Sequence, residues 1–168
     1  MGLRYRLRQL KNNLTAGPLS EVARQEVAVL LSPAERALFT RLSLADQWHS
    51  VRVLGDLRAA GYNDPDLLAA ALLHDVGKTR YPLTAWDRTV IVVGVALLPR
   101  RAARWGQGPP DGWRRPFVIR ARHPEWGAAM AAAAGTRAAV VDLIRRHADR
   151  PGEGDDVLRA LQWADDQN

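Results

Sequence analysis

The sequence contains no cysteine and no long run of apolar residues. Without cysteine, the chain can form no disulfide framework, thiolate zinc site, iron–sulfur cluster or cysteine nucleophile. The longest apolar stretch, 90–98, is interrupted by a glycine and is far shorter than the ~20 residues of a membrane-spanning helix. The basic start of the chain is followed by no apolar segment of the kind found in secretory signals. We therefore expect a soluble, cytoplasmic protein without a membrane span.

Strand patterns are also missing, because no segment alternates apolar and polar residues convincingly, and no internal repeat is present. The 168 residues are enough for one domain, and a chain of this length typically buries ~70% of its unfolded surface. With 47% hydrophobic and 25% charged residues, the composition is that of a folded globular protein. We predict an all-α fold, a single-domain helical bundle over residues 18–168 that is preceded by a basic N-terminal arm over 1–17.

Acidic residues are scarce in two basic segments, and the chain as a whole carries a net charge of +6. Residues 1–20 contain four cations and no acid, and residues 98–122 contain seven arginines and one acid, Asp111. Basic stretches attract the phosphates of nucleotides, nucleic acids or membrane surfaces, and the planar guanidinium suits bidentate phosphate contacts. Such residues can equally keep a helical surface solvated. The charge pattern therefore permits a phosphate ligand without requiring one.

Local capping signals divide the chain into short helices. Residues 32–35 form a capping box, and Asp64 with the proline after it begins another helix, which Gly77 closes. Residues 67–73 of that helix are apolar on every side, which predicts a buried and central position. Pro124 is expected to open an alanine-rich helix. The expected helices span 32–42, 43–61, 64–77, 87–98, 124–135, 137–149 and 155–168, with loops over 106–112 and 150–154.

Histidine is rare, and its placement carries most of the functional information. The chain has four histidines, and one of them, His74, precedes Asp75 at the end of the apolar helix. An ionised aspartate inside a core is strongly unfavourable unless a cation or several hydrogen-bond donors compensate its charge. A bound divalent metal would satisfy the imidazole and the carboxylate together. The doublet therefore indicates a metal site at the end of this helix.

The remaining histidines also occupy inward positions or helix ends. His49 and His147 lie on the apolar faces of their predicted helices, and His123 directly precedes the proline that is expected to open another. Asp165 falls on the apolar face of the last helix, whereas Asp166 falls on the polar face. A single inward histidine is usually an ordinary core residue. Four of them, together with two inward carboxylates, indicate a shared metal centre.

The donor types restrict the metals that such a centre would hold. Imidazole and carboxylate ligands without thiolates suit catalytic transition metals rather than structural zinc. Six candidate ligands exceed the number that one catalytic metal with open positions normally uses. We therefore expect two divalent transition-metal ions bridged by Asp75, iron or manganese first, with zinc, nickel, cobalt or magnesium as alternatives. The candidate metal ligands are His49, His74, Asp75, His123, His147 and Asp165.

In the order H…HD…H…H…D, these residues resemble the pattern of the HD-domain superfamily of metal-dependent phosphohydrolases. The resemblance covers roughly residues 40–168 and rests on the segments DQWHSVRVL, ALLHDVGK, HPEWG, LIRRH and WADD. The sequence is most similar to the branch with two additional histidines, which includes cyclic dinucleotide hydrolases and compact enzymes that split diadenosine polyphosphates. The resemblance implies an HD-type helical domain in which one metal is held by His49, His74, Asp75 and Asp165 and the other by Asp75, His123 and His147.

The same resemblance implies a metal-dependent phosphohydrolase that cleaves a phosphomonoester, phosphodiester or phosphoanhydride of a small nucleotide-like substrate. Asp75 and Lys78 are the expected catalytic residues, and Lys78 matches a lysine that in relatives lies near the substrate phosphate. Arg122 is a second candidate for binding the phosphate, although a surface arginine explains it equally well. The sequence differs from the family pattern at two places that bear on the identity of the substrate. Ala148 stands where related signalling branches carry another histidine, and segment 81–122 is longer and more basic than in compact relatives.

Three alternative functions stay open at this point. A non-catalytic HD module would bind a nucleotide and regulate a partner, although the complete ligand set argues against it. An HD-type di-iron oxygenase would use the same two-metal site. A nucleic-acid-binding protein is the least expected, because no helix-turn-helix or strand-based binding motif is present. No feature of the sequence indicates the oligomeric state.

Overall fold

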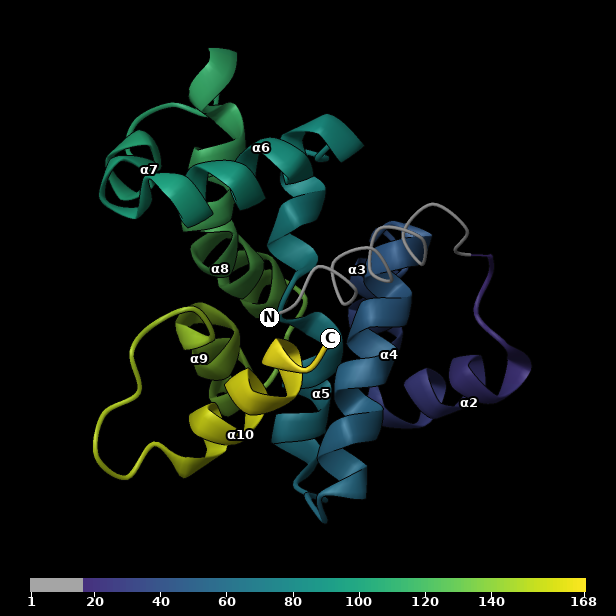
Figure 1. The fold of residues 1–168 in the computed structure, drawn as a ribbon. Helices are drawn as coiled ribbons and strands as arrows, with labels where there is room; N and C mark the ends of the chain where they lie inside the picture. The colour runs from purple at the N-terminus through teal and green to yellow at the C-terminus, as the bar shows by residue number, and fades with distance from the viewer. Residues whose placement is uncertain (1–16) are drawn as a thin grey trace.

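A computed structural model describes residues 17–168, and within this range the chain forms helices and no strands, which confirms the all-α prediction (Figure 1). Residues 1–16 of the predicted basic arm lie outside the described residues, so the arm stays a prediction. No helix among residues 17–168 is long and apolar enough to cross a membrane. The elements are α2 (Glu21–Leu30), α3 (Pro33–Phe39), α4 (Leu44–Ala59), α5 (Pro65–Leu73), the 3₁₀ helix η1 (Val76–Arg80), α6 (Ala85–Leu97), α7 (Pro99–Trp105), the 3₁₀ helix η2 (Gly112–Arg114), α8 (Arg115–Ala133), α9 (Ala138–Arg146) and α10 (Asp156–Asp166).

Helix α5 lies at the centre of the bundle, where it contacts α2, α3, α4, α9 and α10. It begins at Asp64, whose side chain accepts hydrogen bonds from the backbone N–H groups of Asp66 and Leu67. Residues 67–73 are all buried, as the apolar run predicts. Burying a leucine side chain contributes about 1.5–3 kcal/mol, so this helix is firmly anchored. Its anchoring fixes the position of His74, the residue at its C-terminal end.

The predicted extension of this central helix to Gly77 is wrong, because α5 ends at Leu73 and the chain continues in η1. Gly77 lies against α8 so closely that a Cβ atom on it would be 1.9 Å from the carbonyl oxygen of His123. Glycine is therefore needed for a close backbone approach and not to end a helix. The approach brings Asp75, at the start of η1, beside the histidine of α8.

Helix α8 contains Pro124 in its interior, so the prediction that this proline opens a helix is wrong. A proline inside a helix lacks the N–H group that would bond to the carbonyl four residues earlier, which here is that of Arg120. In the structure, the carbonyl oxygen of Arg120 lies 2.9 Å from Nδ1 of His123. The imidazole replaces the missing backbone donor. The helix can therefore continue through the proline, and His123 lies in mid-helix rather than at a helix start.

Helices α6 and α7, here called the α6–α7 lobe, pack on the first part of α8 (Figure 1). The lobe's first helix begins slightly earlier than predicted because Thr84 and Asp87 form a capping box. Its second helix occupies the start of the basic segment, to which the sequence assigned no element. An ion pair of 3.0 Å between Asp87 and Arg115 joins the lobe to α8. The ring of Phe117 fills the space beside Gly94, where a Cβ atom would come within 2.6 Å of it.

Replacing Gly77 by alanine should destabilise the protein strongly, because the added methyl group meets backbone atoms of α8 that cannot move aside. We expect the free energy of unfolding, measured by urea denaturation, to fall by about 3 kcal/mol. The matched control is Gly55→Ala in α4, where no atom lies within 4 Å of the added carbon. This control should gain about 0.5–1 kcal/mol, because glycine is unfavourable inside a helix. Similar stabilities of the two variants would contradict the packing role of Gly77.

Candidate metal centre

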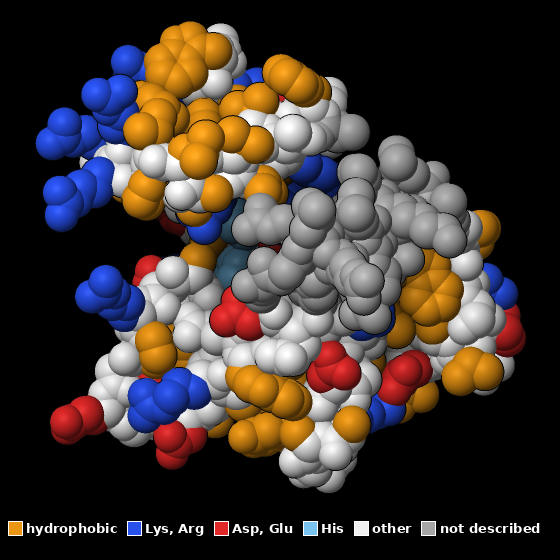
Figure 2. Space-filling view, in the orientation of Figure 1, with side chains coloured by type: hydrophobic (Ala, Val, Ile, Leu, Met, Phe, Trp, Pro, Cys, Tyr) orange, Lys and Arg blue, Asp and Glu red, His pale blue; other side chains and the backbone are white. Residues whose placement is uncertain are grey.

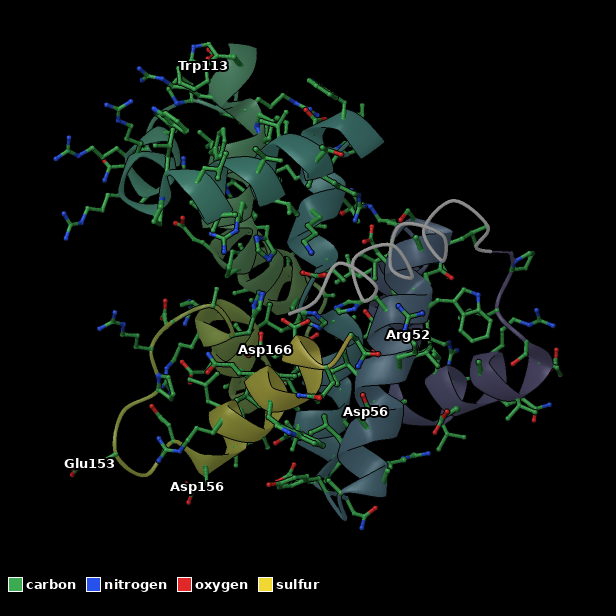
Figure 3. All side chains as sticks on the ribbon, in the orientation of Figure 1. Arg52, Asp56, Trp113, Glu153, Asp156 and Asp166 are labelled. Carbon is green, nitrogen blue, oxygen red and sulfur yellow. The ribbon has the colours of Figure 1, made fainter. Side chains whose placement is uncertain are left out.

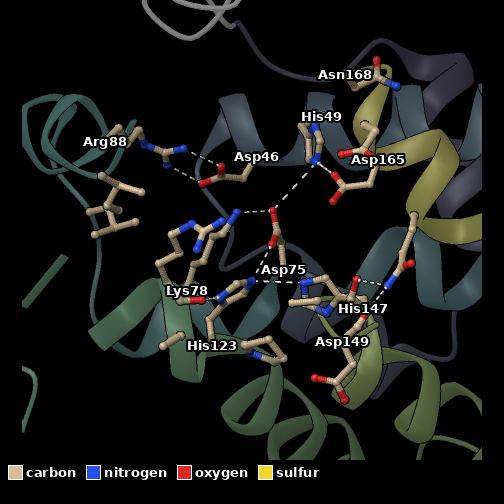
Figure 4. A pocket seen from close by; sticks show the side chains of 18 of the residues that line it. Asp46, His49, Asp75, Lys78, Arg88, His123, His147, Asp149, Asp165 and Asn168 are labelled. Carbon is tan, nitrogen blue, oxygen red and sulfur yellow. Dashed lines mark hydrogen bonds and ion pairs between the residues drawn. The ribbon is translucent and has the colours of Figure 1, made fainter. Parts of the chain in front are cut away.

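Side chains from distant parts of the chain meet at one place in the structure, and they include all six predicted metal ligands. Figure 4 shows five of them, all except His74. Four of the six are buried, namely His74, Asp75, His123 and His147. Of the two adjacent acids near the C-terminus, Asp165 faces the cluster and its neighbour is exposed, as the helical pattern predicts. The predicted metal ligands and the elements that carry them are His49 (α4), His74 (the end of α5), Asp75 (the start of η1), His123 (α8), His147 (the end of α9) and Asp165 (α10).

The first group of donor atoms joins two imidazoles and two carboxylates. Nε2 of His49 lies 2.9 Å from Oδ1 of Asp165 and 3.9 Å from Oδ2 of Asp75. Nε2 of His74 lies 3.6 Å from the same Asp165 oxygen and 3.5 Å from the same Asp75 oxygen. The donor atoms of His49, His74 and Asp75 lie within 4.8 Å of one another, close enough to bind one ion, and Asp165 lies beside the two imidazoles.

The second group uses the other oxygen of the same buried carboxylate. Oδ1 of Asp75 lies 3.3 Å from Nε2 of His123, which in turn lies 3.1 Å from Nε2 of His147. The two oxygens of Asp75 therefore face different sets of donors. This is the arrangement expected of a carboxylate that bridges two metal ions.

Three of the imidazoles are oriented by the backbone of their own helices. Nδ1 of His74 lies 2.9 Å from the carbonyl oxygen of Ala71, and Nδ1 of His147 lies 2.7 Å from that of Ile144. The corresponding atom of His123 faces the carbonyl oxygen freed by the proline, as described above. Because a carbonyl can only accept a hydrogen bond, each Nδ1 carries the proton. A ring in its neutral form then directs the lone pair of Nε2 into the cluster, and this is the form that binds metals.

The cluster contains donor atoms that the protein itself leaves unsatisfied. Nε2 of His74 is buried and has no hydrogen-bond partner. The Nε2 atoms of His123 and His147 face each other at 3.1 Å, and with both rings neutral this places two lone pairs together. An unsatisfied buried polar atom costs about 1–3 kcal/mol. A cation between these atoms would remove both costs, so the donor set fits a metal ion.

Charges around the cluster set the protonation of its groups in the absence of a metal. Burial raises the pKa of Asp75, but the charges of Lys78 and His74 outweigh burial and hold that pKa well below its usual range. Burial lowers the pKa of His74, yet Asp75 and Asp165 raise it overall to about 9. Burial, together with the charge of His74, lowers the pKa of His147 to about 3. At neutral pH without a metal, Asp75 is therefore ionised, His147 keeps a free lone pair, and His74 carries a second proton that a bound metal ion would displace.

Lys78 and a buried ion pair adjoin the predicted ligands. Nζ of Lys78 lies 2.5 Å from Oδ2 of Asp75, and both Asp75 and Asp46 raise the pKa of this lysine against the effect of burial. Asp46 forms two hydrogen bonds with Arg88, of 3.0 and 2.8 Å, and accepts a third of 2.6 Å from Ser43. Neither Asp46 nor Arg88 was among the site residues predicted from the sequence. The available signal was that Asp46 precedes the first histidine ligand by three residues and so shares its helical face.

The cluster opens into a pocket of about 930 Å³, which is visible as a hollow below the α6–α7 lobe (Figure 2). Apolar side chains from the lobe and the chain before it, Leu83, Ile91 and Val92, form part of its wall. The predicted phosphate ligand Arg122 is not among the lining residues. Its guanidinium lies 3.5 Å from the carboxylate of Glu125 and 5.4 Å from the ring of Trp126. The cationic side chains that line the pocket are Arg52, Lys78, Arg88, Arg120 and Arg145.

Replacing Pro124 by alanine should weaken metal binding without unfolding the protein. The new backbone N–H competes with His123 for the carbonyl oxygen of Arg120, so the imidazole loses the hydrogen bond that orients it. We expect metal affinity to fall about tenfold, measured by calorimetric titration of chelator-treated protein with Mn²⁺. Pro116→Ala is the control, since a proline in the first turn of α8 replaces no intrahelical donor. Unchanged affinity in Pro124→Ala would show that this hydrogen bond does not position the ligand.

Metal binding should also stabilise the fold, because the unfolded chain has no preformed site. Adding Mn²⁺ at about 100 times its dissociation constant should stabilise chelator-treated protein by about 2.7 kcal/mol, seen as a rise in Tm. Asp75→Asn should abolish this rise, since it removes the charge shared by both donor groups. Asp166→Asn, a change in an exposed acid next to the cluster, should retain it. A normal metal-induced rise in Asp75→Asn would be incompatible with the proposed centre.

Comparison with known proteins gives one match, in which a model of the HD domain covers residues 48–166. Searches of curated proteins and of solved structures found no match. The matched range begins immediately before His49 and ends immediately after Asp165, so it contains the whole cluster of donors. This range spans well over half of the sequence, so the chain belongs to the HD domain family.

Proposed function

We propose that the protein is a phosphohydrolase that uses two metal ions to cleave a phosphate ester or anhydride of a small nucleotide-like substrate. One observation carries the proposal, the position of Asp75 between two sets of donors. Its Oδ2 faces His49 and His74, while its Oδ1 faces His123. Two metals held a few Å apart can clamp the attacking and leaving oxygens of a phosphoryl transfer, and a shared carboxylate sets their separation.

The residues around this centre have distinct parts in the proposed reaction. When bound, divalent metals would supply Lewis-acid activation of water and neutralise phosphate charge. Asp75 holds the centre together and, as an ionised carboxylate, orients the water that attacks phosphorus. Lys78 lines the pocket with its charge beside Asp75, so it can stabilise the negative charge that develops on the phosphate. Asp46 helps to keep this lysine protonated.

The lining of the pocket supports a phosphorylated substrate that also has an apolar part. Arg88 is held at the wall by its two hydrogen bonds to Asp46, while Arg120 and Arg145 are exposed side chains on α8 and α9. Guanidinium groups suit phosphate oxygens, and the aliphatic wall suits a nucleobase. Among the arginines of α8, Arg120 is better placed than Arg122 for a contact inside the pocket. A role for Arg122 at the outer edge stays a proposal.

The two other HD-type functions would use the same cluster. A regulatory nucleotide-binding module needs no complete metal centre, so the six assembled donors favour an enzyme. A di-iron oxygenase shares the centre but has no need of the many cations that line the pocket, so these favour a phosphate substrate. We propose iron or manganese as the resident metals. Zinc, nickel, cobalt and magnesium are the alternatives that metal analysis separates.

The direct test combines metal analysis of the purified protein with phosphatase and phosphodiesterase assays. The substrates should include nucleotides, cyclic dinucleotides and dinucleoside polyphosphates. We expect about two metal ions per chain and metal-dependent hydrolysis of at least one of these classes. Full metal content without turnover would favour a regulatory module. Oxygen consumption at a mixed-valent iron centre would favour an oxygenase.

Replacing Lys78 by alanine should lower kcat about 100-fold while metal content stays unchanged. The lysine stabilises charge on the phosphate, and its Nζ is not among the donor atoms of the metal groups. The control is Arg80→Ala, which removes an exposed cation from the same 3₁₀ helix without changing the pocket lining. This control should keep its activity. Loss of metal in Lys78→Ala would mean that the lysine maintains the centre instead of acting on the substrate.

A further inference from the structure

The α6–α7 lobe exposes an apolar face on its outer side. Trp86, Val93 and Leu97 of α6 are 73%, 49% and 72% exposed. Their spacing of seven and four residues places them on one side of the helix. Leu98 continues this side into the junction with α7 and is 41% exposed. We call these four residues the outer stripe.

The packing of α6 does not require this stripe, because other sides of the helix make its contacts. Gly94 faces Phe117 of α8, and Asp87 forms an ion pair with Arg115 of α8. Arg88 and Ile91 line the pocket. Contiguous exposed apolar side chains of this kind mark surfaces that interact with a partner or a membrane.

The segment that contains the outer stripe is rich in positive charge. Residues 88–110 contain no acid, and the only acid between Arg88 and Pro124 is Asp111. Trp113 of η2, whose ring contacts Trp105 of α7, is 61% exposed and has the guanidinium of Arg114 at 5.2 Å from its ring (Figure 3). Figure 2 shows hydrophobic side chains gathered over the lobe and Lys or Arg side chains along one edge of it. The exposed arginines of α7 and η2 are Arg100, Arg101, Arg104 and Arg114.

We propose that the α6–α7 lobe docks on an anionic lipid surface, with the outer stripe inserted among the headgroups and the arginines contacting their phosphates. Peripheral membrane helices combine an apolar side containing tryptophan and leucine with flanking basic residues. Each arginine near an anionic surface strengthens binding about fivefold. Insertion would place α6 between the lipid and the pocket, since its opposite side supplies Arg88 and Ile91 to the pocket wall. The proposal does not depend on the proposed hydrolase activity.

Charge argues against the other candidate occupants of this face. In a two-fold dimer the same patch covers itself, so the arginines of two copies would oppose one another. A nucleic acid would complement the charge, but aliphatic side chains such as Val93 and Leu97 offer no hydrogen bonds to bases or phosphates. An anionic bilayer satisfies both properties of the surface, the apolar stripe and the basic residues beside it.

Sedimentation of the full chain with lipid vesicles tests the proposal. We expect binding to vesicles of phosphatidylcholine with phosphatidylglycerol, little binding to phosphatidylcholine alone, and several-fold weaker binding at high salt. Trp86→Ala combined with Leu97→Ala should weaken binding about tenfold or more. Arg100→Gln combined with Arg101→Gln should weaken it about 25-fold. The control pair is Val22→Ala with Val29→Ala on α2, which removes apolar side chains of 75% and 83% exposure away from the lobe and should change nothing.

The outcomes separate the alternatives, provided that circular dichroism shows each variant to be folded. The proposal is overturned if the chain does not bind anionic vesicles. It is also overturned if neither pair of lobe variants weakens binding, because the basic residues elsewhere would then be responsible. Light scattering that shows a dimer in the original chain and a monomer in Trp86→Ala/Leu97→Ala would assign the face to a second copy instead. Turnover of a soluble substrate should be the same in all variants, so failure here leaves the hydrolase proposal intact.

Discussion

The centre of this protein depends on one unfavourable condition, an ionised carboxylate enclosed in the core. Asp75 is almost entirely buried, and its charge must be balanced by cations or donors nearby. Lys78 balances part of that charge from within the same turn, and imidazoles approach from three directions. Because Nε2 of His74 has no hydrogen-bond partner and the Nε2 atoms of His123 and His147 face each other, the protein alone leaves the arrangement incomplete. The cluster is therefore built for a cation, and the fold supplies its shape in advance.

Two features of the backbone make that geometry possible. Gly77 allows η1 to approach α8 more closely than any side chain would permit, which places Asp75 beside His123. Pro124 frees a carbonyl oxygen inside α8, and this oxygen fixes the orientation of the His123 ring. In both cases a residue that usually interrupts regular structure serves to position a donor atom. The positions of the predicted metal ligands thus depend on residues outside the cluster.

Helix α6 lies between the pocket and the outer surface, because one of its sides lines the pocket and the opposite side is exposed. On the inner side, Arg88 reaches the buried Asp46 and Ile91 contributes to the pocket wall. On the outer side, Trp86 and Leu97 remain largely exposed. The helix is held by a few specific contacts with α8 rather than by a deep core of its own. A partner bound to the outer side would therefore lie one helix diameter from the pocket.

Local sequence patterns determined the helical class, the central position of residues 67–73 and the choice of the six candidate ligands, because capping and helical periodicity act over a few residues. They also distinguished Asp165 from its exposed neighbour. Tertiary structure decided the features that arise from contacts between distant segments. The two oxygens of Asp75 face different donor sets only because α4 and α8 approach it from different sides, and Arg88 finds its partner 42 residues away. The predictions for Gly77 and Pro124 were wrong for the same reason. The role of Gly77 depends on the helix packed against it, and the role of Pro124 depends on the His123 side chain that bonds to the freed carbonyl oxygen. No local sequence pattern contains that information.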